Sequence, residues 1–206
     1  EKILKITEKP KNPTSNLAVT GIYLLTPLIF EIIDNLKPSW RNELEITDAL
    51  DSLLKKNNNI SYEMISDYWK DTGTPEDIIH ANGEIIKNIS EYSHGKISEN
   101  VKISGKVITG KNSIIEKHAT ICGPVIIGKN CKINSGVIIG PNTSIGDNSV
   151  INRGNIENSI IMKNCEIDSE INIRNSIISN NSKIIQLNEI NDEKIFLLGE
   201  GTRIYF

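Results

Sequence analysis

An isoleucine recurs at every sixth position from Ile97 to Ile151, and Thr109 is the single exception among these ten positions. An α-helix repeats its buried face every 3.6 residues and a plain strand every two, so neither produces a period of six. A six-residue period is typical of a β-helix, in which each hexad forms one flat wall of a triangular coil. Stacked coils lie about 4.8 Å apart, so each isoleucine is expected to point inward and contact its neighbour in the next coil.

A second set of positions has the same period. Four residues after each isoleucine lies a small or β-branched residue, at Val101, Val107, Ser113, Ala119, Val125, Cys131, Val137, Thr143 and Ser149. The repeat slips after Ile151, and we expect residues 152–160 to form a loop at one corner. A new phase is expected at Ile161, Ile167, Ile173 and, after an interruption at Ser179, Ile185. The sequence predicts a left-handed parallel β-helix, and the apolar segments near the C-terminus are expected to cap its open end.

Composition excludes several classes of protein. The 206 residues carry a net charge of −3 without a basic stripe, so no nucleic-acid partner is expected. Thr20, Pro27 and Glu31 interrupt the most apolar stretch, residues 17–33, so we expect no membrane span. The three cysteines contain no CxxC pair, and Cys131 and Cys165 fall at inward positions. They predict buried free thiols in a reducing compartment, and with no secretory signal visible the protein is expected to be cytoplasmic.

The first half of the chain alternates apolar strands with helices, the pattern of an α/β fold. Strands are predicted at residues 3–7, 18–25 and 60–65, the second of them buried on both faces. Three helices are predicted, with Thr26, residue 47 or 48, and Thr74 as their N-caps and with Pro27 and Pro75 in the first turn of the first and third. They are expected to run to about residues 36, 56 and 89.

An interior strand so near the start of a chain requires neighbouring strands that these residues do not supply. We therefore expect residues 1–90 to be the second part of a larger, incomplete Rossmann-like domain whose first part lies upstream. Residues 91–206 are expected to form a second domain, the β-helix with its cap.

Several polar residues lie at the end of a predicted strand or the start of a helix, where open α/β sheets bind ligands. Lys9 and Arg41 are cations suited to a phosphate group. Glu8 is suited to accepting hydrogen bonds from sugar hydroxyls, and Gly21 allows a ligand to approach the backbone. Asp71 is a candidate Mg²⁺ ligand, because that ion requires only one or two carboxylates besides phosphate oxygens.

Each of these residues also has a structural interpretation. Lys9 with the following proline can be a surface turn, and Gly21 a packing glycine. Arg41 and Glu45 can be an ion pair on a helix surface, and Asp71 the first residue of a capped turn.

Four motifs in order give the chain a resemblance to a known family. They are EKP at residues 8–10, SNLAVTGIY at 15–23, PSWRNELEITDAL at 38–50 and YWKDTGTPEDIIHAN at 68–82. This order resembles the sugar-1-phosphate nucleotidyltransferases. The runs ELEITD and DTGTP favour the glucose-1-phosphate thymidylyltransferase branch, whereas the mannose-1-phosphate guanylyltransferases usually have DVG in place of DTG. The Ser-Ile-Ile phrases at Ser159 and Ser176 and the closing LLGEGT are similar to the long form of that enzyme.

The resemblance implies a site and a reaction. Glu8 and Gly21 would contact the sugar, Lys9 and Arg41 its phosphate, Asp71 would bind Mg²⁺, and Trp69 would line the pocket or belong to the core. A sugar-1-phosphate and a nucleoside triphosphate would be the substrates: glucose-1-phosphate would attack the α-phosphorus of dTTP, giving dTDP-glucose and pyrophosphate. The family's Gly-rich nucleotide loop and first metal-binding aspartate are missing from these residues. We therefore expect no turnover from this chain alone.

Two alternatives remain open. Left-handed β-helices also occur in acyltransferases, which use a histidine as a general base. His118 is the only histidine within the hexads, and it is expected on the surface; His80 and His94 lie outside the coils without obvious partners. Bifunctional relatives carry a longer tail with an HLSY-like segment that this chain lacks. The other alternative is a non-catalytic scaffold that forms a homo-oligomer, a trimer through the flat walls.

Overall fold

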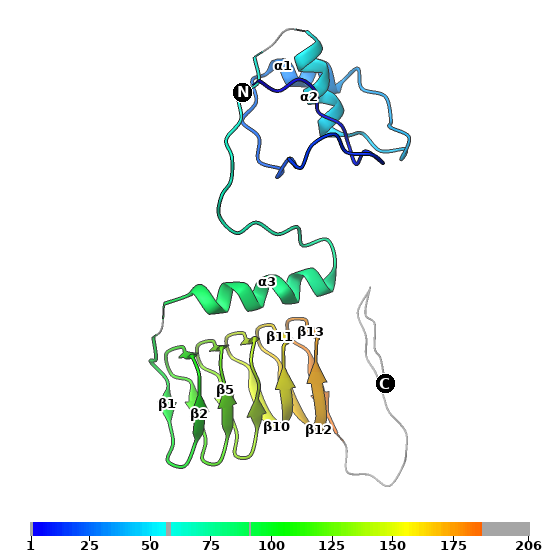
Figure 1. Ribbon diagram of the computed structural model, residues 1–206. Coiled ribbons are helices and arrows are strands. Elements are labelled where there is room, and N and C mark those ends of the chain that lie inside the picture. The colour runs from blue at the N-terminus through cyan, green and yellow to red at the C-terminus, as the bar shows by residue number, and fades with distance from the viewer. Residues whose placement is uncertain (1, 57–58, 91, 187–206) are drawn as a thin grey trace. The chain divides into compact units, whose positions relative to one another are not determined.

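The computed structural model describes residues 2–56, 59–90 and 92–186 and divides the chain into two compact units, Glu1–Trp69 and Lys70–Phe206. The first unit contains the helices α1 and α2, and the second contains α3 and a stack of parallel strands (Figure 1). Each unit has a hydrophobic core of its own.

Two short helices form the core of the first unit. α1 spans Leu28–Ile33 and α2 spans Ile46–Lys55. Apolar residues three or four positions apart lie on one face of each helix, and the two faces pack together. The buried residues of this core are Ile29, Ile32, Ala49, Leu50 and Leu53.

Both predicted helices form, but their predicted caps are wrong. α1 begins two residues after Thr26, and its N-cap is Pro27, which makes no side-chain cap hydrogen bond. α2 begins directly after its N-cap Glu45, so residues 47 and 48 lie inside the first turn. The hydroxyl of Thr47 donates instead to the carboxylate of Glu8, and this tertiary contact replaces the expected local one.

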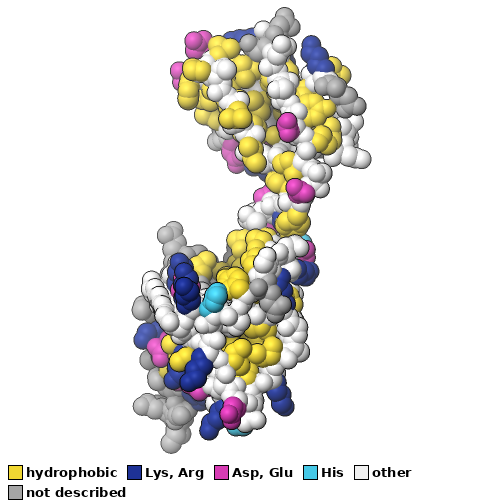
Figure 2. Space-filling model, turned by 90° about the vertical axis from the view of Figure 1, so that its left-hand side faces the viewer, with side chains coloured by type: hydrophobic (Ala, Val, Ile, Leu, Met, Phe, Trp, Pro, Cys, Tyr) yellow, Lys and Arg dark blue, Asp and Glu magenta, His cyan; other side chains and the backbone are white. Residues whose placement is uncertain are grey.

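The three predicted strands of the first half are absent from the described residues 2–56 and 59–90. The segments at 3–7, 18–25 and 60–65 are extended or irregular without ladder partners. The segment predicted to be buried on both faces is exposed, with Ile22 78% and Leu24 102% accessible. A strand requires a neighbour for its backbone hydrogen bonds, and the described part of this unit provides none. Figure 2 shows the resulting hydrophobic side chains on the surface.

α3 spans Pro75–Asn88 and lies alongside the β-helix (Figure 1). The predicted cap is confirmed, because Thr74 accepts a 3.2 Å hydrogen bond from the backbone N–H of Asp77. Ile79, Gly83 and Ile86 are buried and recur on one face at helical spacing. That face packs on the strands.

Fourteen parallel strands form the described part of the β-helix. They stack into three walls. One wall is a separate five-stranded sheet of β3, β6, β9, β11 and β13. The other two walls belong to one sheet, because β10 and β12 are long enough to run along both of them. The bounds are β1 Lys96–Ile97, β2 Lys102–Ser104, β3 Val107–Thr109, β4 Ile114–Ile115, β5 Thr120–Cys122, β6 Val125–Ile127, β7 Lys132–Ile133, β8 Ile138–Ile139, β9 Thr143–Ile145, β10 Val150–Glu157, β11 Ile160–Ile161, β12 Glu166–Arg174, β13 Ile177–Ile178 and β14 Lys183–Ile185. The predicted parallel β-helix is thus confirmed.

The register gives the coil length. Ile97 pairs with Ile115, Ile115 with Ile133 and Ile133 with Ile151, each 18 residues further on. Three hexads therefore complete one coil. The inward isoleucines are confirmed from Ile115 to Ile151, where none is more than 2% exposed. Ile97 and Ile103 keep the predicted register, opposite Ile115 and Ile121, but are 42% exposed because their coil has a neighbour on one side only.

The coils shorten after Ile151. Ile151 pairs with Ile167 after 16 residues, and Ile167 with Ile184 after 17. The predicted loop at 152–160 is wrong, since β10 continues through the corner with irregular register at Arg153. The shorter coil also moves the last inward position from the predicted Ile185, which is 46% exposed, to Ile184. The predicted C-terminal cap lies outside the described residues.

Asparagines in the left-handed backbone conformation turn the chain at the corners. At one corner five of them, with φ between 54° and 62°, form a ladder of four hydrogen bonds of 3.0–3.1 Å, in which each side-chain amide donates to the oxygen of the next asparagine. They are Asn112, Asn130, Asn148, Asn164 and Asn181. Asparagine tolerates this conformation better than most residues, and the ladder also satisfies the amide groups.

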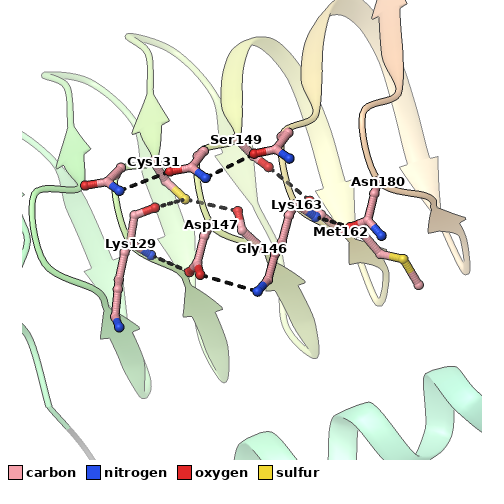
Figure 3. A network of polar contacts seen from close by, with 11 residues as sticks. Lys129, Cys131, Gly146, Asp147, Ser149, Met162, Lys163 and Asn180 are labelled. Atoms are coloured by element: carbon pink, nitrogen blue, oxygen red, sulfur yellow. Dashed lines mark hydrogen bonds and ion pairs between the residues drawn. The ribbon is translucent and has the colours of Figure 1, made fainter.

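Serine and cysteine alternate from coil to coil on the inner side of the same corner, and Figure 3 shows Cys131 and Ser149 of this series. Ser113 Oγ accepts from the N–H of Cys131 at 2.9 Å, and Ser149 Oγ accepts from that of Cys165 at 3.1 Å. The thiol of Cys131 donates to the Gly146 carbonyl at 3.2 Å. Both thiols are free and buried as predicted, and burial raises their pKa.

Candidate functional site

Glu8 and Arg41 come together in the first unit, with Glu8 Oε1 3.6 Å from Arg41 Nη1. The other oxygen of Glu8 accepts a 2.9 Å hydrogen bond from Thr47 in the first turn of α2. The side chains of Glu8 and Arg41 are 22% and 24% exposed, so both are held by the fold and still reach solvent. This pair is the best-defined part of the candidate site.

A tight turn before α2 positions Arg41. The N–H of Ser39 donates to the Glu43 carbonyl at 2.8 Å, and Asn42 adopts φ 60°. Glu45, the N-cap of α2, accepts from Ser39 Oγ at 2.9 Å and from Arg41 Nη1 at 3.3 Å. The Arg41–Glu45 pair is therefore a contact between a turn and a helix start, and not a pair on a helix surface.

Arg41 faces three carboxylates. Besides Glu8 and Glu45, its Nη2 lies 3.0 Å from Glu43. Glu43 is the least enclosed of the three, with a side chain 56% exposed, against 10% for Glu45. A guanidinium has five N–H donors, so a phosphate that replaces the exposed Glu43 can bind while Glu45 keeps the group in place.

The other candidate residues of this unit are exposed. Lys9 adopts φ 33° before Pro10, and Gly21 adopts φ 80° with open space where a Cβ would lie. Trp69 is 46% exposed and does not belong to the core. Among the described residues, the contacts join Glu8 to Arg41 but join none of Lys9, Gly21 and Trp69 to that pair.

Asp71 lies in the second unit, in the exposed segment before α3. Gly73, two residues further on, lies beside its carboxylate, since a Cβ there would lie 3.8 Å from Asp71 Oδ1. In the described part of the chain no three His, Cys, Asp or Glu side chains gather as a metal site. A lone exposed carboxylate fits Mg²⁺ when phosphate oxygens and water complete the shell.

The segment that holds Asp71 is tied to the first turn of α3. Lys70 Nζ lies 2.5 Å from Asp77 Oδ1, and Thr74 Oγ1 donates to Asp77 Oδ2 at 2.7 Å. These hydrogen bonds, that from Lys70 above all, lower the pKa of Asp77.

A groove of about 630 Å³ lies on the five-stranded wall of the β-helix. Its lining includes Ile160 on that wall, the corner residues Lys129 and Lys163, and His94, whose ring lies 5.6 Å from that of Tyr92. His94 was expected outside the coils, without an obvious partner. In the structure the N–H of His94 donates to the Thr109 carbonyl at 2.9 Å and so adds to this wall.

Residues of opposite charge alternate from coil to coil along one corner of the groove. Asp147 accepts from the N–H of Lys129 at 2.8 Å and lies 3.7 Å from Lys163 Nζ (Figure 3). A repeat in the sequence could have indicated this corner: a glycine followed by a charged residue recurs every 18 residues, with the charge at Lys111, Lys129 and Asp147. His118, the predicted alternative, is exposed at another corner with φ 64°.

No helix of the described residues combines the length and apolarity that a membrane crossing requires.

Comparison with protein families gives two matches. Residues 1–88 match the nucleotidyl transferase family, and residues 121–205 match the GMPPB C-terminal domain. The first match includes α3, which packs on the β-helix in space.

Curated relatives agree with these matches. The bifunctional protein GlmU of Methanococcus aeolicus is 42% identical over 97% of this chain and 44% of its own length. The low-salt glycan biosynthesis nucleotidyltransferase Agl11 of Haloferax volcanii is 41% identical over 51% of this chain and 29% of its own length. The glucose-1-phosphate thymidylyltransferase of Streptomyces antibioticus is 35% identical over 54% of this chain and 32% of its own length.

The chain thus spans less than half the length of these relatives. The family matches, the ordered motifs and the β-helix agree on the class of protein. Residues 1–88 belong to the nucleotidyl transferase family, in its sugar-1-phosphate branch, and a parallel β-helix follows them.

Proposed function

We propose that this chain carries the sugar-phosphate side of a nucleotidyltransferase that makes dTDP-glucose and pyrophosphate from dTTP and glucose-1-phosphate. The proposal is supported by the contacts of Glu8 with Arg41 and Thr47, in which a carboxylate suited to sugar hydroxyls lies 3.6 Å from a guanidinium suited to phosphate. The relative from Streptomyces antibioticus, which is named for this reaction, supports the choice of nucleotide and sugar.

The sugar contacts Glu8 and the backbone at Gly21. A carboxylate fixed on one oxygen by Thr47 keeps lone pairs for sugar hydroxyls. The open space at Gly21 allows a ring to approach the main chain. Trp69, exposed in the same unit, is a candidate wall of the sugar pocket.

The phosphate binds to Arg41 and Lys9. Arg41 is held by Glu45, so binding requires only that the exposed Glu43 give way. Glu43→Gln removes the competing anion, and we expect it to lower the KM for the sugar phosphate. Arg41→Lys loses the planar group that binds two oxygens at once, and we expect it to raise that KM.

Asp71 would hold Mg²⁺ together with the nucleotide phosphates. The ion would neutralise charge that develops on those phosphates when a sugar-phosphate oxygen bonds to the α-phosphorus and the bond to pyrophosphate breaks. Asp71→Asn is expected to raise the Mg²⁺ concentration needed for half-maximal rate.

The nucleotide-binding side must come from other residues. Ile22, Leu24 and Phe30 are each at least 66% exposed, and large apolar side chains left exposed in this way can be covered by a further segment of protein. We propose that a nucleotide-binding segment, encoded upstream or carried by a partner chain, covers these residues and completes the site.

The test is pyrophosphate release by the native protein that contains this chain, measured with dTTP, UTP and GTP against glucose-, mannose- and N-acetylglucosamine-1-phosphate. We expect the highest kcat/KM for dTTP with glucose-1-phosphate, and a loss in Glu8→Gln that Glu43→Gln does not share. Turnover with another pair of substrates would support a sugar-phosphate nucleotidyltransferase and refute dTTP and glucose-1-phosphate as its substrates. Absence of turnover with every pair would refute the proposal.

A second function is favoured by one observation. The relative named a bifunctional protein covers 97% of this chain, including the β-helix with its groove. Acyl transfer is the candidate, with His94 as the general base, because its ring lines the groove whereas His118 lies at another corner. Acetyl transfer from acetyl-CoA to an aminosugar phosphate, lost in His94→Ala and kept in His118→Ala, would support it.

The β-helix is also proposed to assemble the protein as a trimer through a flat wall. Sedimentation of the native protein and of a form without residues 97–186 tests this role. We expect the deletion to change the mass in solution more than the turnover. Loss of turnover in a surviving oligomer would contradict the scaffold.

A further inference from the structure

α3 belongs by sequence to the nucleotidyl transferase match, yet its buried face packs on the β-helix. At the middle of α3, Asn82 Nδ2 donates to the Asn142 carbonyl at 3.0 Å, and Ser144 Oγ donates to Asn82 Oδ1 at 2.6 Å. The side-chain amide of Asn82 thus forms hydrogen bonds through both its nitrogen and its oxygen, to two residues of the β-helix.

Close packing surrounds this amide. A Cβ at Gly83 would lie 3.4 Å from Asn142 Cγ, which is ordinary contact for alanine and leaves no space for a larger side chain. Ile79 and Ile86, one turn to either side, are 5% and 1% exposed. The helix therefore cannot slide or rotate on the strands without separating these contacts.

The C-terminal end of α3 is held as well. Lys106, in the first coil, donates its ammonium group to the carbonyls of Lys87 and Ile89. A cation at this end also complements the partial negative charge of the helix terminus.

The N-terminal end of α3 holds the candidate metal ligand. Thr74 caps the helix through Asp77, and Lys70 pairs with Asp77, so both sides of Asp71 are tied to the first turn. A continuous series of contacts runs from Ser144 through Asn82 and α3 to this segment.

We infer that Asn82 is a positioning residue through which the β-helix orders residues 70–77, the segment that carries Asp71. The role of Asp71 rests on the proposed function; the ordering of the segment does not. The β-helix then has a part in the transfer reaction in addition to assembly.

Hydrogen exchange of the native protein tests the ordering. In Asn82→Ala and in Ser144→Ala we expect the amides of Asp77 and Ile78, which donate to Thr74 at the end of this segment, to exchange about tenfold faster, while those of β6 and β9 stay protected. Ser144→Thr keeps the hydroxyl and should keep wild-type protection. Gly83→Leu should act like Asn82→Ala by a different route, because it separates α3 from Asn142.

Asn88→Ala is the matched control. Asn88 is an exposed asparagine of the same helix whose side chain donates to the Glu84 carbonyl at 3.0 Å and makes no described contact with the β-helix. If Asn82→Ala exchanges like Asn88→Ala, the positioning role is refuted.

Kinetics test the consequence for catalysis. Asn82→Ala should lower kcat by about 10- to 100-fold and raise the Mg²⁺ requirement, with the KM for the sugar phosphate unchanged. An equal fall in Asn88→Ala, or a rise in KM alone, would refute the positioning role. Absence of turnover in the wild type would refute the proposed function, and the exchange result would still decide the ordering.

Discussion

Thr47 Oγ1 donates a 2.9 Å hydrogen bond to Glu8 Oε2 across 39 positions of the sequence. The bond joins the residue that follows the segment 3–7 to the first turn of α2. Thr47 is 7% exposed, so water competes little for its hydroxyl. The orientation of Glu8 therefore depends on α2 as well as on its own loop.

Thr47→Val should disturb both stability and binding. Loss of the hydroxyl removes one partly buried hydrogen bond, with an expected cost of about 1 kcal/mol in the free energy of unfolding. The KM for sugar phosphate should rise because Glu8 is no longer held. Urea unfolding and initial rates measure the two effects, and Thr47→Ser, which keeps the hydroxyl, should show neither.

Asp51 should make the first unit sensitive to acid. Burial raises its pKa, but hydrogen bonds from Lys55 at 2.7 Å and from the Ile6 N–H at 3.3 Å outweigh burial and leave the pKa below its ordinary value of 3.8. A carboxylate whose pKa is lower in the folded than in the unfolded protein stabilises the folded state at pH values above its unfolded-state pKa. This stabilisation is lost as the pH falls through the folded-state pKa.

The unfolding free energies of wild type and Asp51→Asn should therefore differ at pH 7 and converge below about pH 4. Lys55→Met removes the main partner and should reduce the same difference. A gap between wild type and Asp51→Asn that stays constant down to pH 2 would contradict the assignment.

Adjacent isoleucines of β8 should respond very differently to truncation. Ile139 is fully buried and Ile138 is 43% exposed on the outer face. Ile139→Ala leaves a cavity and should cost about 2–5 kcal/mol, whereas Ile138→Ala should cost well under half of that. Thermal unfolding of the pair measures the contrast, and equal costs would contradict the inward register.

The three cysteines should differ in reactivity. Cys131 and Cys165 are buried, and burial raises the pKa of both thiols, while Cys122 is partly exposed. A thiol reagent at pH 7.5 should label one cysteine quickly in the folded protein and all three in denaturant. Rapid labelling of Cys131 in the folded state would show that the coil opens at that corner.

The β-helix was predictable because its inner side chains repeat. Each inward position contacts the same position of the next coil, so isoleucine at one coil favours isoleucine at the next. The prediction failed where the coil length changed: the sequence places Ile185 in phase, but a coil of 17 residues places Ile184 inside. Hexad counting cannot detect a residue lost at a corner.

The first half was less predictable because its structure depends on distant contacts. Thr74 was correctly identified as a cap, since its partner Asp77 is three residues away. The strand at residues 18–25 did not form, because apolar β-branched sequence predicts a strand only when a neighbour pairs with it. The family resemblance assigned Glu8 and Arg41 to one site, but their direct contact and the contact of Glu8 with Thr47 had no signal in the sequence.

α3 also sets a limit on how the repeat region can evolve. Its 14 residues span about 21 Å, the height of roughly four coils. Its contacts include Lys106 in the first coil and Ser144 two coils further on. Coils added at the far end leave the contacts of this helix unchanged, whereas deletion of a coil beneath it removes residues that it packs on. The number of coils can therefore increase more easily than it can decrease.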